Sequence, residues 1–188
     1  MRPTRCLIAC CLLLLPLLCP PGAGAEPFSL IVCGTGGEQL YEERFFDWGM
    51  RLRSVLVERL GHPEANVRLM MQDIEPARAA GITSSSLENI RAHLEEAAAR
   101  LSGDDVLFVF LIGHGSHQMG VNRFNIDGPD LTSQDLKEML AAIPAREIVL
   151  INAASSSAGF INDLSGDARI VCTATRNVEE RNATDFME

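Results

Sequence analysis

Short apolar runs alternate with helical patterns along this 188-residue chain. Five runs have the length and composition of buried strands: 28–33, 67–71, 106–112, 147–152 and 169–174. Strands that alternate with helices build parallel sheets whose faces the helices cover. The pattern therefore predicts one α/β domain with the strand order 2-1-3-4-5 and helices on both faces of the sheet.

Three segments have the apolar spacing of the covering helices. The first runs from Glu38 to Leu60, and Gly61 follows as a stop signal. The second begins at Ser85-Ser86-Leu87-Glu88, where a serine precedes a glutamate by three residues, as in a capping box. The third begins at Thr132-Ser133-Gln134-Asp135 and is closed by Pro144.

Residues 1–25 have the three-part layout of a secretory signal peptide. Two arginines precede an apolar stretch from Leu7 to Leu18, and Ala23-Gly24-Ala25 follows. We therefore expect a secreted or periplasmic mature domain of residues 26–188, with no membrane span, because none of its segments reaches the ~20 apolar residues that one needs. A lipoprotein anchored through Cys19 is less favoured, because Leu18 stands where a small residue is wanted.

Charge and cysteine content narrow the possible partners. Cleavage after residue 25 leaves 14 basic and 25 acidic side chains, a formal charge of −11. This charge, and the lack of a basic stripe interleaved with aromatic residues, excludes nucleic acid as an expected ligand. The mature chain keeps Cys33 and Cys172, both in apolar strand-like runs. We expect both to be free, buried thiols.

A glycine-rich turn, Gly34-Thr35-Gly36-Gly37, follows the first predicted strand. If this turn has a function, it would bind a dinucleotide, with Asp73 as the ligand of the ribose. Gln39 occupies the third glycine position, however, and Asp73 lies further on than the usual ~20 residues. An ordinary strand-to-helix turn is therefore favoured, and we expect neither a cofactor nor a metal ion.

The ends of the third and fourth predicted strands carry the best candidate site. His114 lies between Gly113 and Gly115 after the strand 106–112, and Ala154 follows the strand 147–152. Ligands of open parallel sheets bind beyond the carboxyl ends of the strands. If these two strands are neighbours, about 4.8 Å apart, the residues beyond their ends meet in one crevice.

Several motifs in this order resemble the legumain branch of the caspase-like cysteine peptidases. The strand 106–112 followed by Gly113-His114-Gly115-Ser116 resembles the legumain strand followed by Asp-His-Gly-Ser. Ile151-Asn152-Ala153-Ala154 falls on the legumain motif Ile-Glu-Ala-Cys. Asp130 to Leu136 resembles the legumain helix start Asp-Leu-x-x-x-Asp-Leu. Thr173 to Thr184 resembles the stretch after the fifth strand. Tyr41-Glu42-Glu43-Arg44 resembles Tyr-Asn-Tyr-Arg.

The resemblance implies a caspase-like three-layer αβα sandwich with a mostly parallel sheet. It also implies that the family's sixth strand is missing from this chain, which would then be truncated at its C-terminus. It assigns His114 and Gly115 to the catalytic site, and Arg44 and Asn152 to the pocket for the substrate's P1 side chain. Glu42 falls on an asparagine that assists the histidine.

Departures from the legumain pattern bear on activity. Ala154 stands at the nucleophile position, and a methyl group cannot attack a carbonyl. Gly113, Glu42 and Asn152 also differ from the legumain residues at their positions. We therefore expect an inactive homologue that binds a peptide or protein.

Two alternatives remain open. A hydrolase could use Ser155, or its neighbours Ser156 and Ser157, with His114 as the base. A serine oxygen about 3 Å from the imidazole would favour this hydrolase. A structural relic whose crevice binds nothing is the other alternative.

Overall fold

The structure is a computed structural model, and it describes residues 25–181, 184 and 187. The predicted signal peptide and the Cys19 site lie outside the described residues. In chain order the helices and strands are β1 (Pro27–Cys33), α1 (Gln39–Ser54) and its π-helical continuation η1 (Val55–Arg59), the 3-10 helix η2 (Glu64–Asn66), β2 (Val67–Met71), α2 (Glu75–Ala79), β3 (Thr83–Ser84), α3 (Leu87–Arg100), β4 (Val106–Ile112), β5 (Gly115–Gln118), β6 (Val121–Phe124), β7 (Leu131–Thr132), α4 (Ser133–Ala141), β8 (Glu147–Asn152), α5 (Gly159–Leu164) and β9 (Arg169–Thr173).

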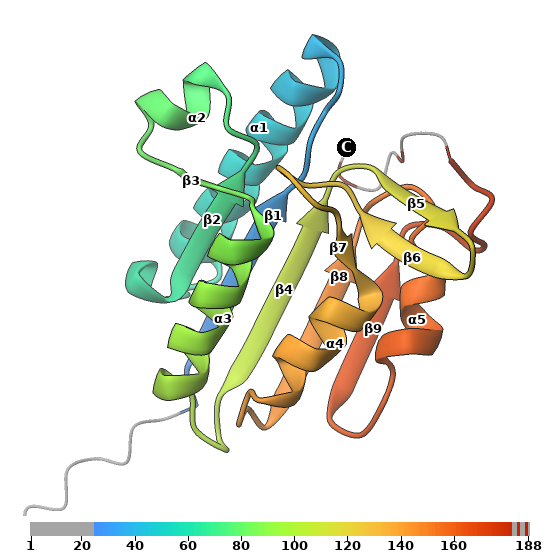
Figure 1. Cartoon of the computed structure of the whole chain (residues 1–188). Coiled ribbons are helices and arrows are strands. Elements are labelled where there is room, and N and C mark those ends of the chain that lie inside the picture. The colour runs from blue at the N-terminus through green and yellow to red at the C-terminus, as the bar shows by residue number, and fades with distance from the viewer. Residues whose placement is uncertain (1–24, 182–183, 185–186, 188) are drawn as a thin grey trace, which may run out of the picture.

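One parallel sheet organises the domain (Figure 1). Its strand order is β3-β2-β1-β4-β8-β9, and every recorded pair is parallel. The five predicted strands are present, and their predicted order 2-1-3-4-5 is confirmed as β2-β1-β4-β8-β9. The two-residue strand β3 adds an edge that the sequence did not predict, because two residues carry no periodicity.

Helices cover both faces of this sheet and give the expected αβα layers. α3, α4 and α5 share a buried cluster with β1, β4 and β8, and Ile90, Leu136 and Phe160 each contribute a buried side chain from one of the three helices. α1 packs on the other face through Phe45, next to residues of β1 and β2. Figure 1 shows α3 and α4 in front of the sheet and α1 behind it.

The two predicted thiols differ in their surroundings. Both cysteines are free, and Cys33 is buried beneath α1, but Cys172 is exposed. Val171 packs toward the helices in front, so its neighbours Ile170 and Cys172 face the other side. α1 packs there on β1 and β2, and no described helix covers β9 on that face. The prediction of a buried Cys172 is therefore wrong.

A second, three-stranded antiparallel sheet, β5-β6-β7, lies at the carboxyl edge of the large sheet. The hairpin between β5 and β6 turns at Met119 and Gly120, both of which have positive φ angles, 52° and 76°. Two-residue hairpin loops of type I′ need this conformation at both central positions. The sequence reasoning missed the hairpin, because its strands are short and polar and Met119 is an unusual residue for such a turn.

Helix boundaries follow local capping chemistry. The capping box at Thr132 and Asp135 is present as predicted, and it begins α4. For α3 the N-cap is Ser86, whose side chain accepts a hydrogen bond from the backbone of Asn89. The predicted box, which starts at Ser85, is therefore displaced by one residue, because Ser85 is fully buried and its backbone N–H donates to Met71. No helix in the part of the chain that the structure describes is long and apolar enough to cross a membrane.

Candidate functional site

β4 and β8 are direct neighbours, so the segments that follow them meet beyond the edge of the sheet. The Gly115 N–H donates to Ser155 Oγ at 3.1 Å. A Cβ added to Gly115 would lie 2.6 Å from the Ser155 carbonyl oxygen and 3.6 Å from the Ala154 Cβ. The first of these contacts is too short for any real side chain. Glycine at 115 therefore lets the two segments touch, and the structure brings Gly115, Ala154 and Ser155 together as the sequence indicated.

The imidazole of His114 is half-buried against α1. Its ring centroid lies 4.7 Å from that of Tyr41 and 5.1 Å from that of Phe45, both in edge-on arrangements. Burial lowers the pKa of His114, whereas a hydrogen bond to the Gly36 backbone and the charge of Glu38 act in the opposite direction. The net effect favours a neutral imidazole.

Ala154 packs into the opposite layer of the molecule. Its side chain is 1% exposed and belongs to the buried cluster that β1, β4 and β8 share with α3, α4 and α5. The ring of His114 contacts Tyr41 and Phe45, which pack with the cluster beneath α1. The resemblance assigns His114 as the base and Ala154 to the nucleophile position. The backbones of these two residues lie side by side, but their side chains pack against different layers.

The three serines after Ala154 are all 1% exposed. The Ser155 hydroxyl accepts from the Gly115 N–H and lies 3.3 Å from the Gly115 carbonyl oxygen, to which it donates. The Ser157 hydroxyl pairs with that of Thr175 at 3.2 Å. Ser156 has a positive φ of 52°, and its hydroxyl has no hydrogen-bond partner among the described residues. Within the same residues, no hydrogen bond joins a serine to His114.

The three residues predicted to bind substrate lie in different surroundings. Arg44 is exposed on α1. Glu42 accepts a hydrogen bond from Gln72 at 3.0 Å and lines a cavity of about 610 Å³ beside α2. Asn152 is 1% exposed, and its Oδ1 accepts from the backbone N–H of Ala154 at 3.1 Å. Among the described residues the Asn152 Nδ2 has no partner. Glu42 thus lies at a surface cavity, whereas Asn152 lies in the interior at the end of β8.

The glycine-rich turn lies against the hairpin. A Cβ added to Gly34 would lie 2.2 Å from the Asn125 carbonyl oxygen, and the Gly36 N–H donates to the Gln72 side chain. Close packing of this protein's own backbone thus accounts for glycine at 34, as the favoured interpretation of an ordinary turn requires. The described residues contain no group of three or more His, Cys, Asp or Glu side chains placed to hold a metal ion.

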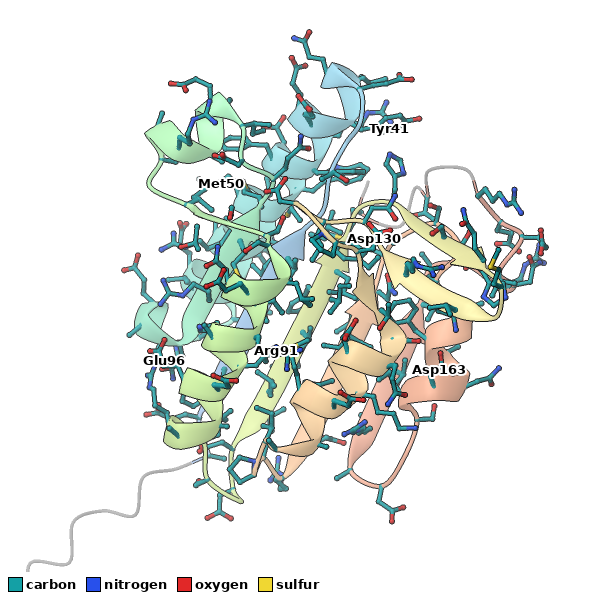
Figure 2. The ribbon with its side chains drawn as sticks, viewed as in Figure 1. Tyr41, Met50, Arg91, Glu96, Asp130 and Asp163 are labelled. Atoms are coloured by element: carbon teal, nitrogen blue, oxygen red, sulfur yellow. The ribbon has the colours of Figure 1, made fainter. Side chains whose placement is uncertain are left out.

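The sequence reasoning missed a hydrogen-bonded chain beneath the hairpin. His117 Nδ1 lies 2.7 Å from Asn122 Oδ1, and Asn122 Nδ2 donates to Asp163 at 2.6 Å. The Ser133 hydroxyl donates to the same carboxylate oxygen at 2.5 Å. Figure 2 labels Asp163 beside α5, well away from Tyr41 on α1. These four residues, which we call the hairpin network, belong to four elements and share no sequence motif.

Comparisons with known proteins identify the family to which the chain belongs. The chain is similar to the crystal structure of protein GSU0716 from Geobacter sulfurreducens, with a TM-score of 0.49 and 12% identity over 69% of this chain. It spans half the length of that protein. The search of curated proteins returned no match. The model of the peptidase C13 family matches residues 94–187, half of the chain, and this range includes both strand ends at the candidate site. The chain belongs to the peptidase C13 family, the legumain family, as its motifs predicted.

Proposed function

We propose that this chain is a secreted or periplasmic C13-family domain that binds peptides at the carboxyl edge of its sheet without cleaving them. The observation that carries the proposal is the state of the residues after β8. Ala154 offers a buried methyl group, and Ser155 and Ser157 use their hydroxyls to hold the turn together. Nucleophilic catalysis needs a nucleophile within hydrogen-bond reach of an oriented base, and His114 has no such partner among the described residues.

Membership of the family supports peptide as the ligand class. Tyr41 on α1 contacts the ring of His114, and Arg44, three residues further along the same helix, is exposed. A guanidinium at this edge suits a carbonyl or carboxylate of a peptide side chain. The net negative charge argues against polyanions, as it did from sequence.

Ser156 defines the second candidate function, a serine hydrolase. Its φ of 52° and its unpartnered, buried hydroxyl are features that occur at strained functional positions. Burial opposes this role, because the hydroxyl is not open to a substrate and has no base within hydrogen-bond distance. Ser155, the serine first considered from sequence, is the weaker candidate, because Gly115 engages its hydroxyl twice.

Activity-based labelling separates the two functions. The chain without residues 1–25 is treated with a fluorophosphonate probe and with a library of Asn- and Asp-containing peptides. We expect neither labelling nor turnover. Labelling that Ser156→Ala and His114→Ala both abolish would establish the hydrolase and overturn the proposal.

Peptide binding is tested with the same library on an array. We expect Arg44→Ala to lose the bound peptides and Arg51→Ala, two turns further along α1, to retain them. An array on which wild type binds no peptide would contradict the proposal and favour the structural relic. Secretion is tested by expression of the full chain, with cleavage near Ala25 as the expected result and an intact N-terminus as the contrary one.

A further inference from the structure

The hairpin network contains an imidazole that no motif of the chain singled out. His117 on β5 faces Asn122 on β6 as a cross-strand pair. Asn122 is 5% exposed and Ser133 is 4% exposed, whereas His117 is only partly buried. The network therefore runs from the interior, at α4 and α5, to an imidazole at the surface of the hairpin.

The orientation of the Asn122 amide follows from its partner on α5. An ionised carboxylate can only accept hydrogen bonds, so the atom of Asn122 that approaches Asp163 has to be the donor, Nδ2. The Ser133 hydroxyl donates to the same carboxylate oxygen and adds to this constraint. The amide oxygen Oδ1 is then the atom that faces His117.

Close packing removes room for another arrangement. A Cβ on Gly159, the first residue of α5, would lie 2.0 to 2.4 Å from the three end atoms of the Asn122 side chain. The glycine thus lets the amide pack directly against the backbone of the helix. A tightly packed side chain with both ends hydrogen-bonded has one preferred orientation.

The position of the proton on His117 follows in turn. Oδ1 is an acceptor, so the ring nitrogen 2.7 Å away, Nδ1, has to carry the proton. In a neutral imidazole the other nitrogen, Nε2, then has a free lone pair. The described residues place no hydrogen-bond donor on Nε2. The fold thus fixes one tautomer and leaves its acceptor nitrogen available.

His117 also lies next to the candidate site. Gly115 and His117 are two residues apart in β5, so they lie on the same face of the strand. On this face, Gly115 meets the carbonyl oxygen of Ser155. By contrast, the His114 ring forms a hydrogen bond with the Gly36 backbone and interacts with the charge of Glu38. Of the two imidazoles, His117 is the one whose proton position a carboxylate determines.

We propose that the hairpin network holds His117 as the Nδ1–H tautomer, so that its Nε2 accepts a hydrogen bond from a backbone N–H of a bound peptide. This inference rests on the proposed peptide-binding function and adds a recognition residue to it. A peptide amide fits, because it presents a neutral donor and needs no compensating charge from the protein.

Nitrogen-15 NMR of the histidine rings tests the tautomer directly, because protonated and unprotonated ring nitrogens have well-separated shifts. We expect the unprotonated nitrogen of His117 to be Nε2. Asp163→Asn lets the Asn122 amide turn around, so a population with Nε2–H should appear. Gln134→Ala is the matched control, since this exposed residue of α4 lies outside the hairpin network and its loss should keep the single tautomer. A wild-type His117 that carries its proton on Nε2 would overturn the inference.

Binding to the peptide array tests the ligand. We expect His117→Ala to weaken binding of the wild-type peptides by about five- to tenfold, the effect of one hydrogen bond. Gln118→Ala, on the opposite face of β5, should leave affinity unchanged. Full affinity in His117→Ala would overturn the inference alone, whereas a wild type that binds no peptide would remove the proposed function as well. The two failures are thus distinguishable.

Discussion

Two polar regions meet at the turn between β8 and α5, and they are built in opposite ways. In the candidate site, the His114 ring packs against two aromatic side chains. The Ser155 hydroxyl bonds the Gly115 backbone, and the Ser157 hydroxyl pairs with that of Thr175. In the hairpin network, four side chains form a continuous run of short hydrogen bonds. A continuous run of side-chain hydrogen bonds is thus found in the hairpin network and not at the position that the family resemblance assigns to the nucleophile.

The two regions also differ in how many of their buried polar atoms lack a hydrogen-bond partner. Among the described residues, four buried polar side-chain atoms lack a partner, and two of them, Asn152 Nδ2 and Ser156 Oγ, lie at the end of β8 and in the turn after it. None belongs to the hairpin network. Buried groups without partners cost stability, so native proteins retain few of them. The end of β8 and the turn after it therefore leave buried polar atoms unpaired, whereas the hairpin network pairs its own.

Gly159→Ala should have the largest effect on stability. The new methyl group would overlap the Asn122 amide, whose Oδ1 lies 2.0 Å from the ideal Cβ position, and would break both of its buried hydrogen bonds. We expect the free energy of unfolding to fall by about 3 kcal/mol. Urea unfolding measures this change. Gly166→Ala, where no atom lies within 4 Å of the added Cβ, is the control and should stay within about 0.5 kcal/mol of wild type. Equal effects of the two substitutions would contradict the importance of the hairpin network.

Gly115→Ala disturbs the candidate site in the corresponding way and should have a smaller effect. The added Cβ would lie 2.6 Å from the Ser155 carbonyl oxygen and 2.9 Å from that of Arg123. The turn after β8 has to shift, but the added Cβ meets two backbone oxygens, and the one side-chain atom among its three nearest neighbours lies at an ordinary contact distance of 3.6 Å. We expect a loss of about 2 kcal/mol in the free energy of unfolding. A loss larger than that of Gly159→Ala would reverse the comparison between the two regions.

The sequence predicted the scaffold more fully than the polar regions. β4 and β8 were predicted with their bounds, because seven consecutive apolar residues in β4 and four in β8 leave a clear signal in a doubly covered sheet. The positions of His114 and Ala154 after these strands followed from the same runs. The direction of the His114 ring did not follow, because it depends on Tyr41 and Phe45, which are far away in the sequence.

The hairpin network could not be predicted from local patterns. Asn122 and Asp163 are 41 residues apart, and Ser133 and Asp163 are 30 apart, so only the folded hairpin and helices bring them together. Single polar residues in short strands and at helix starts have ordinary local explanations, such as turns and caps. The one local hint is Gly159, whose lack of a side chain admits Asn122.

Two neighbouring serines sharpen the comparison within the candidate site. Ser155→Ala removes the acceptor of the Gly115 N–H, and we expect a loss of about 1 to 2 kcal/mol in the free energy of unfolding. Ser156→Gly removes an unpartnered hydroxyl and a side chain from a position with φ of 52°, so we expect a gain of about 0.5 to 1 kcal/mol. Urea unfolding of both variants checks the two signs. Destabilisation by Ser156→Gly would show that its hydroxyl has a partner in solution.

The smallest expected effect concerns the charge of His114. Burial lowers its pKa in the folded state below the ordinary value of 6.5, so the unfolded chain binds the proton more tightly than the folded chain does. The free energy of unfolding should therefore fall as the pH drops from about 8 to about 5.5, and should not depend on this group above about pH 8. His62 and His93 have pKa values lowered by burial as well, and burial raises the pKa of Asp127, so the total pH dependence does not isolate His114.

The difference in the free energy of unfolding between wild type and His114→Gln isolates the contribution of His114, because the other groups are common to both proteins. We expect the wild-type curve to be the steeper one on acidification. Parallel curves would mean that the imidazole is as well solvated in the folded domain as in the unfolded chain, and would contradict its burial against Tyr41 and Phe45.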